Sequence, residues 1–125
     1  MDLLARTADL IAIPSESHHE AALADHVEAR LRALAHVRVD RLGDNGVART
    51  TGGRSPRLVV AGHLDTGPVN DNGTPEIRGD VLWGLGASDM KGGLAVMLEL
   101  AATVPEPAVD VTWVFYAGEE VSADH

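Results

Sequence analysis

The chain has 125 residues, 45% of them hydrophobic and 23% charged, which is enough for one globular domain with a hydrophobic core. Its formal net charge of −9 disfavours nucleic acid or an anionic membrane as a partner, and the lack of cysteine excludes disulfides, thiolate zinc sites and cysteine nucleophiles. Charged residues at positions 2, 6 and 9 interrupt the first ten residues, so these do not resemble a signal peptide, and we expect a cytoplasmic protein.

The first half of the chain predicts two helices followed by a hairpin. Apolar residues recur at helical spacing over 2–12 and again over 18–35. Ser17-His-His-Glu20 fits a capping box at the start of the second helix. Alternating apolar residues over 37–41, followed by a glycine-rich turn, predict a hairpin whose second strand covers 46–50.

The second half predicts a strand, a helix and a second strand. β-favouring apolar residues at 57–62 and 110–116 predict two buried strands, and the apolar stripe at 90–104 predicts the helix between them. This order indicates a parallel crossover connection. The segment after Asp65 is rich in Pro, Gly and Asn, so we expect irregular structure there apart from a short strand at 81–83. The predicted fold class is therefore α/β, with a mostly parallel sheet flanked by helices.

Five polar residues lie where the predicted strands end or where the connecting helix starts. His63 and Asp65 follow the first strand, Glu119 and Glu120 follow the second, and Asp89 precedes the helix. Open α/β sheets bind ligands in the crevice at this edge, so we expect the five side chains to meet there. Side chains two positions apart on an extended chain point to the same side, which lets Asp65 take the ring N–H of His63.

An imidazole and several carboxylates, with no sulfur ligand, suit zinc, cobalt or manganese. Carboxylates in one crevice repel each other unless they are protonated or bind metal. Asp89 has two oxygens with which to bridge a pair of ions. Of the adjacent glutamates, one can bind metal while the other acts as a general base toward water. This chemistry gives hydrolysis of an amide or peptide bond. The simpler alternatives are a His63–Asp65 pair that caps a strand end and a solvated Glu119–Glu120 loop.

Four motifs resemble those of the M20 family of dinuclear metallohydrolases, which includes aminoacylases, carboxypeptidases, acetylornithine deacetylases and succinyl-diaminopimelate desuccinylases. They are Ile13-Pro-Ser15, Gly62-His-Leu-Asp-Thr66, Gly84-Leu-Gly-Ala-Ser-Asp-Met-Lys-Gly-Gly93 and Tyr116-Ala-Gly-Glu-Glu120. The resemblance covers essentially the whole chain. Within the family, the motifs around His63 and Glu120, with Asn70-Asp-Asn72, are most similar to the actinobacterial type of succinyl-diaminopimelate desuccinylase.

This resemblance implies a role for each site residue. His63, Asp89 and Glu120 would bind two zinc or cobalt ions, with Asp89 as the bridge and a cis peptide bond after it. Asp65 would orient His63, and Glu119 would be the general acid/base. The implied reaction is hydrolysis of N-succinyl-LL-2,6-diaminopimelate to succinate and LL-diaminopimelate in lysine biosynthesis, so the implied partner is a small N-acylated amino acid.

Members of the family run to several hundred residues. Two further metal ligands, and a smaller domain that mediates dimerisation and contacts substrate, come from segments that this chain lacks. We therefore expect 1–125 to be the N-terminal part of the catalytic domain, with little activity alone, and the parent protein to be a homodimer. The alternatives are another M20 amidohydrolase, such as an acetylornithine deacetylase or a dipeptidase, and a non-catalytic metal-binding remnant.

Two further expectations concern single side chains. Trp83, Trp113 and Phe115 lie in apolar segments, so we expect all three in the core. Lys91, the one lysine of the chain, lies two residues after Asp89 and is expected to face either substrate or solvent.

Overall fold

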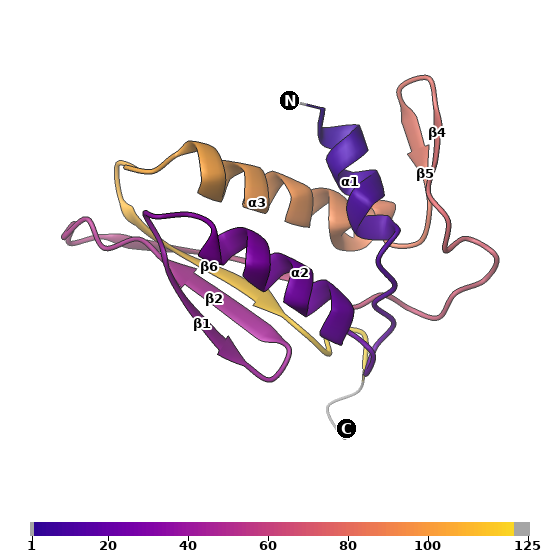
Figure 1. Cartoon of the computed structure of the whole chain (residues 1–125), viewed down its shortest axis with the longest axis horizontal. Helices are drawn as coiled ribbons and strands as arrows, with labels where there is room; N and C mark the ends of the chain where they lie inside the picture. The colour runs from indigo at the N-terminus through magenta and orange to yellow at the C-terminus, as the bar shows by residue number, and fades with distance from the viewer. Residues whose placement is uncertain (1, 122–125) are drawn as a thin grey trace.

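The computed structural model describes residues 2–121. Within this range, helices lie against one face of a sheet, and a small hairpin projects from the body (Figure 1). The elements in chain order are α1 (Leu3–Ile11), α2 (Ala21–Arg32), β1 (Arg38–Leu42), β2 (Asn45–Arg49), β3 (Arg57–His63), β4 (Glu76–Arg78), β5 (Val81–Trp83), the irregular turn η1 (Ala87–Lys91), α3 (Gly92–Thr103) and β6 (Asp110–Tyr116). The predicted α/β class is confirmed.

The main sheet has the strand order β1-β2-β6-β3. β3 and β6 are parallel and are joined through α3, which confirms the predicted crossover. The sheet is mixed, however, and not mostly parallel as predicted. The β1–β2 hairpin packs onto β6 through β2, and both β1–β2 and β2–β6 are antiparallel. The parallel pair β3–β6 therefore brings the carboxyl ends of two strands to one edge, where His63 lies opposite Tyr116.

Apolar side chains from the helices and from β6 form the core between α2, α3 and the sheet. They include Leu23, Val27 and Leu31 of α2, Leu94, Met97 and Leu98 of α3, and Val111, Trp113 and Phe115 of β6. Trp113 and Phe115 are buried as predicted, but the prediction for Trp83 is wrong, because this residue is 58% exposed. Trp83 ends β5, which pairs with β4 in a two-stranded hairpin outside the main sheet, so its side chain lies away from the core between the sheet and the helices.

The start of α2 differs from the predicted capping box. The helix begins at Ala21, and Glu20 makes no side-chain hydrogen bond to the helix N-terminus. The Ser17 hydroxyl donates to the carboxylate of Asp65, and the Glu20 carboxylate accepts the backbone N–H of Gly118. Both side chains thus form tertiary contacts with the edge of the sheet, and these contacts replace the local cap.

Lys91 faces neither substrate nor solvent. Its side chain is buried, with 2% of the residue exposed, and Nζ donates to the carbonyl oxygens of Leu10 at 3.0 Å and Ile13 at 2.8 Å. Burial lowers the pKa of Lys91 to about 8. The ammonium group therefore ties η1 to the C-terminal end of α1, which is a favourable position for a cation.

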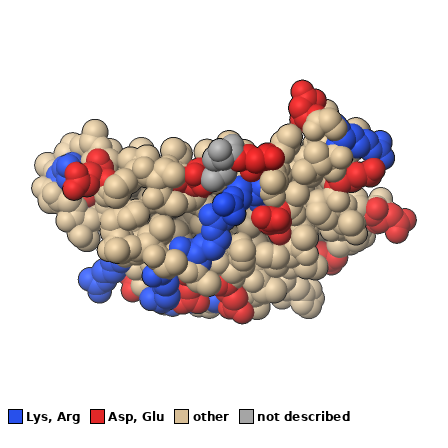
Figure 2. Space-filling view, turned by 45° about the horizontal axis from the view of Figure 1, so that its top comes forward, with Lys and Arg blue, Asp and Glu red and all other residues tan. Residues whose placement is uncertain are grey.

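The surface is largely uncharged on the face shown in Figure 2, where basic side chains lie close to acidic ones. Arg41 pairs with Asp25, Glu28 and Asp44. Among residues 2–121, no helix combines the length and the apolar character needed to cross a membrane.

Candidate metal centre

His63 is the last residue of β3 and is 6% exposed. Its Nδ1 lies 2.9 Å from the backbone carbonyl oxygen of Asp65, and its Nε2 lies 2.8 Å from Oδ1 of Asp89. A carbonyl can only accept, so Nδ1 carries the proton and Nε2 is the atom presented to the carboxylates. Burial lowers the pKa of the imidazole, but the hydrogen bonds to Asp89 and Asp65 and the nearby charges of Asp89 and Glu119 outweigh it, so the pKa of His63 is raised.

Three carboxylates from distant parts of the chain surround this nitrogen. Nε2 of His63 lies 2.8 Å from Asp89, 3.8 Å from Oε2 of Glu119 and 3.9 Å from Oε1 of Glu120. In the part of the chain that the structure describes, the ion pairs of these carboxylates all run to His63. A hydrogen bond to Asp89 raises the pKa of Glu120, and burial and the negative charges of Glu119 and Asp89 add to this effect. The cluster is therefore short of positive charge.

The donor atoms suit a divalent cation. One ligand atom from each of His63, Asp89 and Glu120 lies within 4.8 Å of the other two. Imidazole nitrogen and carboxylate oxygen are ligands that zinc, cobalt and manganese accept, and a cation among them would relieve the repulsion between the carboxylates. The structure thus brings together the three residues expected to bind metal, with Glu119 beside them.

Asp65 lies directly beneath this cluster and is fully buried. Its carboxylate accepts hydrogen bonds from the Ser17 hydroxyl at 2.7 Å and from the backbone N–H groups of Glu119 and Glu120, each at 2.9 Å. Burial raises the pKa of Asp65, but these hydrogen bonds outweigh it, so the pKa is lowered. The carboxylate is 3.5 Å from Nδ1 of His63. The imidazole N–H is therefore directed to the Asp65 carbonyl, while the Asp65 carboxylate holds the glutamate pair.

Asp89 is presented by the irregular turn η1. The backbone angles of Asp89 and Met90 are not helical, and the peptide bond between these residues is cis, as the resemblance implied. The turn is held by the Lys91 ammonium and by a hydrogen bond from the Lys91 N–H to the carbonyl of Gly86 at 2.8 Å. The sulfur of Met90 accepts the backbone N–H of His63 at 3.3 Å, which connects the turn directly to the end of β3.

A cavity of about 480 Å³ opens beside the cluster. Asp89 and Glu120 line one part of it, and Thr66, Asn72 and Trp83 line others. Its described lining contains no Lys or Arg. An uncharged part of a substrate could occupy this space next to the candidate metal ligands, whereas anionic groups of a substrate would find no cationic partner in this lining.

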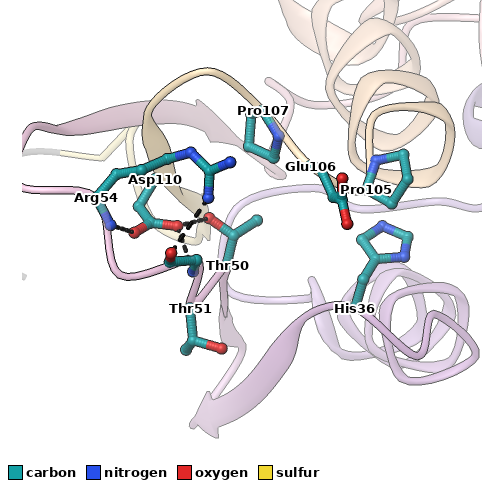
Figure 3. Close-up of a pocket in the computed structure, with 9 residues that line it drawn as sticks. His36, Thr50, Thr51, Arg54, Pro105, Glu106, Pro107 and Asp110 are labelled. Atoms are coloured by element: carbon teal, nitrogen blue, oxygen red, sulfur yellow. Dashed lines mark hydrogen bonds between the residues drawn. The ribbon is translucent and has the colours of Figure 1, made fainter.

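A second pocket, of about 330 Å³, lies at the amino end of β6 and near the end of α3 (Figure 3). There the buried Asp110 accepts hydrogen bonds from the Thr50 hydroxyl at 2.8 Å and from the backbone N–H groups of Gly52 at 2.7 Å and Arg54 at 2.8 Å. These bonds lower the pKa of Asp110 to about 2. The carboxylate is occupied by hydrogen bonds that hold a loop. The His36 imidazole in this pocket lies beside Pro105 and pairs with the Ala101 carbonyl at 2.6 Å (Figure 3).

Sequence reasoning missed two residues that support the centre, Ser17 and Glu20. Their spacing before a helix matches a capping box, and this local interpretation concealed their contacts with Asp65 and Gly118. An available signal was the position of both residues just after Ile13-Pro-Ser15, one of the motifs that carried the family resemblance.

Comparison with known proteins decides the family. The sequence profile of peptidase family M20/M25/M40 matches residues 59–124, which is more than half of the chain and includes every predicted site residue. The chain belongs to peptidase family M20. The predicted resemblance is thereby confirmed.

Curated relatives of this M20 chain extend the match to nearly its whole length. A Mycobacterium tuberculosis protein, provisionally named a succinyl-diaminopimelate desuccinylase, is 51% identical over 98% of the chain. The succinyl-diaminopimelate desuccinylase of Corynebacterium glutamicum is 41% identical over 99% of it. In each case the match covers 35% of the relative. The chain therefore spans about a third of the length of the curated relatives it matches.

Solved structures confirm the M20 fold. Human carnosine dipeptidase 1 superposes on 97% of the chain with a TM-score of 0.82 at 17% identity, which concerns the fold alone. A tripeptidase from Staphylococcus aureus superposes on 94% with a TM-score of 0.79 at 26% identity. The match covers 32% of the first structure and 36% of the second.

Proposed function

We propose that the parent protein of this M20 chain is a dinuclear metal-dependent amide hydrolase, and specifically a cytoplasmic succinyl-diaminopimelate desuccinylase. The observation that carries the proposal is the cluster in which the His63 imidazole meets the carboxylates of Asp89, Glu119 and Glu120 at one edge of an M20 fold. The desuccinylase names of the relatives, at 51% and 41% identity, support the narrower assignment.

In this proposal His63, Asp89 and Glu120 hold the metal ions, which are zinc or cobalt. Asp89, whose carboxylate lies 2.8 Å from Nε2 of His63, would take the bridging role that the family resemblance implies, since its two oxygens can each bind an ion. The residues 1–125 form the N-terminal part of the catalytic domain. The remaining ligands, the contacts to the substrate carboxylates and a dimerisation domain belong to other parts of the parent polypeptide.

The reaction that fits this arrangement is attack of water on the succinyl amide carbonyl. Bound divalent ions would supply Lewis acidity, which acidifies water and stabilises negative charge on the carbonyl oxygen. The Glu119 carboxylate, which is beside the cluster and is not needed as a ligand, accepts the proton of the attacking water. It then returns this proton to the amide nitrogen as the C–N bond breaks, and succinate and the free amine leave. The Asp65 carboxylate keeps Glu119 in place by accepting a hydrogen bond from the Glu119 backbone N–H.

The test is a comparison of substrates on the full-length parent enzyme. We expect Zn²⁺- or Co²⁺-dependent hydrolysis of N-succinyl-LL-2,6-diaminopimelate, and loss of turnover after chelation that returns when metal is added back. A clear preference for N-acetylornithine or for a dipeptide would replace the desuccinylase assignment with another M20 activity. Tight stoichiometric metal binding with no hydrolysis of any of these substrates would favour a non-catalytic remnant.

A further inference from the structure

We propose that Glu20 is a positioning residue that fixes the Glu119–Glu120 pair against the metal-binding edge. This inference rests on the proposed function, because it assigns Glu20 a role in how that site is held. Glu20 precedes α2 and lies 98 positions before Gly118, whose backbone N–H its carboxylate accepts.

Four consecutive backbone N–H groups after β6 are held by side chains from elsewhere in the chain. Ala117 donates to Asn45 at 2.8 Å and Gly118 donates to Glu20 at 2.9 Å. Glu119 and Glu120 then donate to the two oxygens of Asp65. The segment has no strand or helix partner for these groups, so three side chains replace the hydrogen bonds that regular structure would provide.

Glu20 holds the point at which this segment changes direction. Gly118 has a φ of +76°, a left-handed conformation that glycine adopts at little cost. Rotation about this residue would swing the two glutamates that follow it. The N–H of Gly118 itself donates to the Glu20 carboxylate, one residue before the two N–H groups that donate to Asp65. Glu20 therefore restrains the backbone where a small change of angle has the largest effect on Glu119 and Glu120.

The contact is of a kind that is costly to lose. Glu20 is 3% exposed, and a hydrogen bond from an N–H to a carboxylate is stronger than one between neutral groups. Glu20 occupies the N-cap position of α2, but its side chain makes no hydrogen bond to the helix N-terminus. The local sequence favours a cap, and the fold uses the side chain for the loop.

The experiment compares Glu20→Ala and Glu20→Gln in the full-length parent protein, with Glu28→Ala as the matched control. Glu28 lies on α2, the helix that Glu20 precedes, but its carboxylate pairs with Arg32 and Arg41. Amide hydrogen exchange of the metal-free protein reports the hydrogen bond, and Co²⁺ titration followed by absorbance reports the site. We expect Glu20→Ala to speed exchange at Gly118 and to weaken Co²⁺ binding by about 10-fold, a loss typical of residues that support metal ligands.

Glu20→Gln keeps an oxygen that can accept the Gly118 N–H, so we expect it to retain both exchange protection and Co²⁺ affinity, as Glu28→Ala should. If Glu20→Ala does not fold, Glu20→Asp replaces it, because the shorter carboxylate keeps the charge but withdraws from Gly118. Exchange at Gly118 as slow in Glu20→Ala (or in Glu20→Asp) as in wild type would overturn the inference. Faster exchange with unchanged Co²⁺ affinity would also overturn it. A full-length wild-type parent that takes up no Co²⁺ would overturn the proposed function, whereas loss of Co²⁺ affinity in Glu20→Ala without faster exchange at Gly118 would overturn the positioning role alone.

Discussion

Asp65 and Asp110 lie at opposite ends of the parallel strand pair and have the same hydrogen-bond chemistry. Each is buried, and each carboxylate accepts one hydroxyl and two backbone N–H groups. Both therefore hold a loop against the end of a strand, and the pKa of each is lowered. At both ends, therefore, a buried aspartate that accepts three hydrogen bonds stabilises the local structure.

The two ends differ in what surrounds the aspartate. Asp110 forms an ion pair with a cation, the guanidinium of Arg57, at 3.9 Å. Beside Asp65 lie the His63 imidazole and three further carboxylates. In the described chain, the ion pairs of these three carboxylates all run to His63. The candidate metal site is thus marked by an excess of carboxylates over cations. A buried, hydrogen-bonded aspartate alone would not distinguish the candidate metal site, because both ends of the strand pair have one.

The largest difference between the two ends should appear on removal of the imidazole. We expect His63→Ala to weaken Co²⁺ binding by more than ~100-fold, because it deletes a proposed direct ligand, whereas changes to residues that support metal ligands cost about 10–100-fold. Asp110→Asn should leave the affinity unchanged. Isothermal titration calorimetry measures both. Equal affinities for His63→Ala and wild type would remove the distinction between the two ends.

Substitution of Asp65 and of Asp110 tests whether each aspartate affects stability alone or Co²⁺ binding as well. We expect Asp65→Asn to lower the melting temperature and also to weaken Co²⁺ binding by about 10–100-fold, because the glutamate pair loses its anchor. Asp110→Asn should lower the melting temperature alone. Calorimetry of unfolding and of binding on the same samples gives both values. A loss of Co²⁺ affinity in the Asp110 variant would show that the ends are coupled.

The acid dependence of stability should carry the signature of Asp110. Its pKa falls from an ordinary 3.8 to about 2 on folding, so the folded state binds fewer protons between these values. The stabilisation is fully present above pH 4 and is lost as the pH falls toward 2. The gap in unfolding free energy between wild type and Asp110→Asn should therefore shrink over this range, as followed by urea titration and circular dichroism. A gap that stays constant from pH 5 to pH 2 would contradict the lowered pKa.

The smallest expected effect separates two glycines with similar backbone angles. Gly118 has a φ of +76° and Gly43, in the β1–β2 turn, has a φ of +60°. Neither would place an added Cβ in a crowded position, so alanine at either site should cost about 1–2 kcal/mol of stability from backbone strain. Only Gly118→Ala should also weaken Co²⁺ binding, because it precedes Glu119. Denaturant unfolding and Co²⁺ titration would show whether this holds, and equal Co²⁺ affinities would count against it.

Contacts between distant segments were predictable where the hydrophobic pattern of the sequence was strong. The apolar runs that became β3 and β6, with a helical stripe between them, were enough to predict the parallel pair and the edge at which the site residues meet. The β4–β5 hairpin was predicted only in part, because its strands are three residues long and largely exposed. Short strands of this kind lack the periodicity on which such a prediction depends.

The supporting contacts were not predictable from local sequence. Glu20 has the spacing of a helix cap, and its true partner lies 98 positions away. Lys91 is charged, and nothing near it in sequence shows that two carbonyls at the end of α1 accept hydrogen bonds from its ammonium group. In both cases a tertiary contact outcompetes the local preference, and only the folded arrangement shows which one prevails.

The different surroundings of the two tryptophans give the protein a built-in pair of optical reporters. Trp113 is buried among core side chains, so its fluorescence follows unfolding. Trp83 is 58% exposed and lines the cavity that Asp89 and Glu120 also line, so its emission responds to what enters that space. With Trp113 replaced by phenylalanine, the remaining signal would follow occupancy of the cavity in real time, without a label.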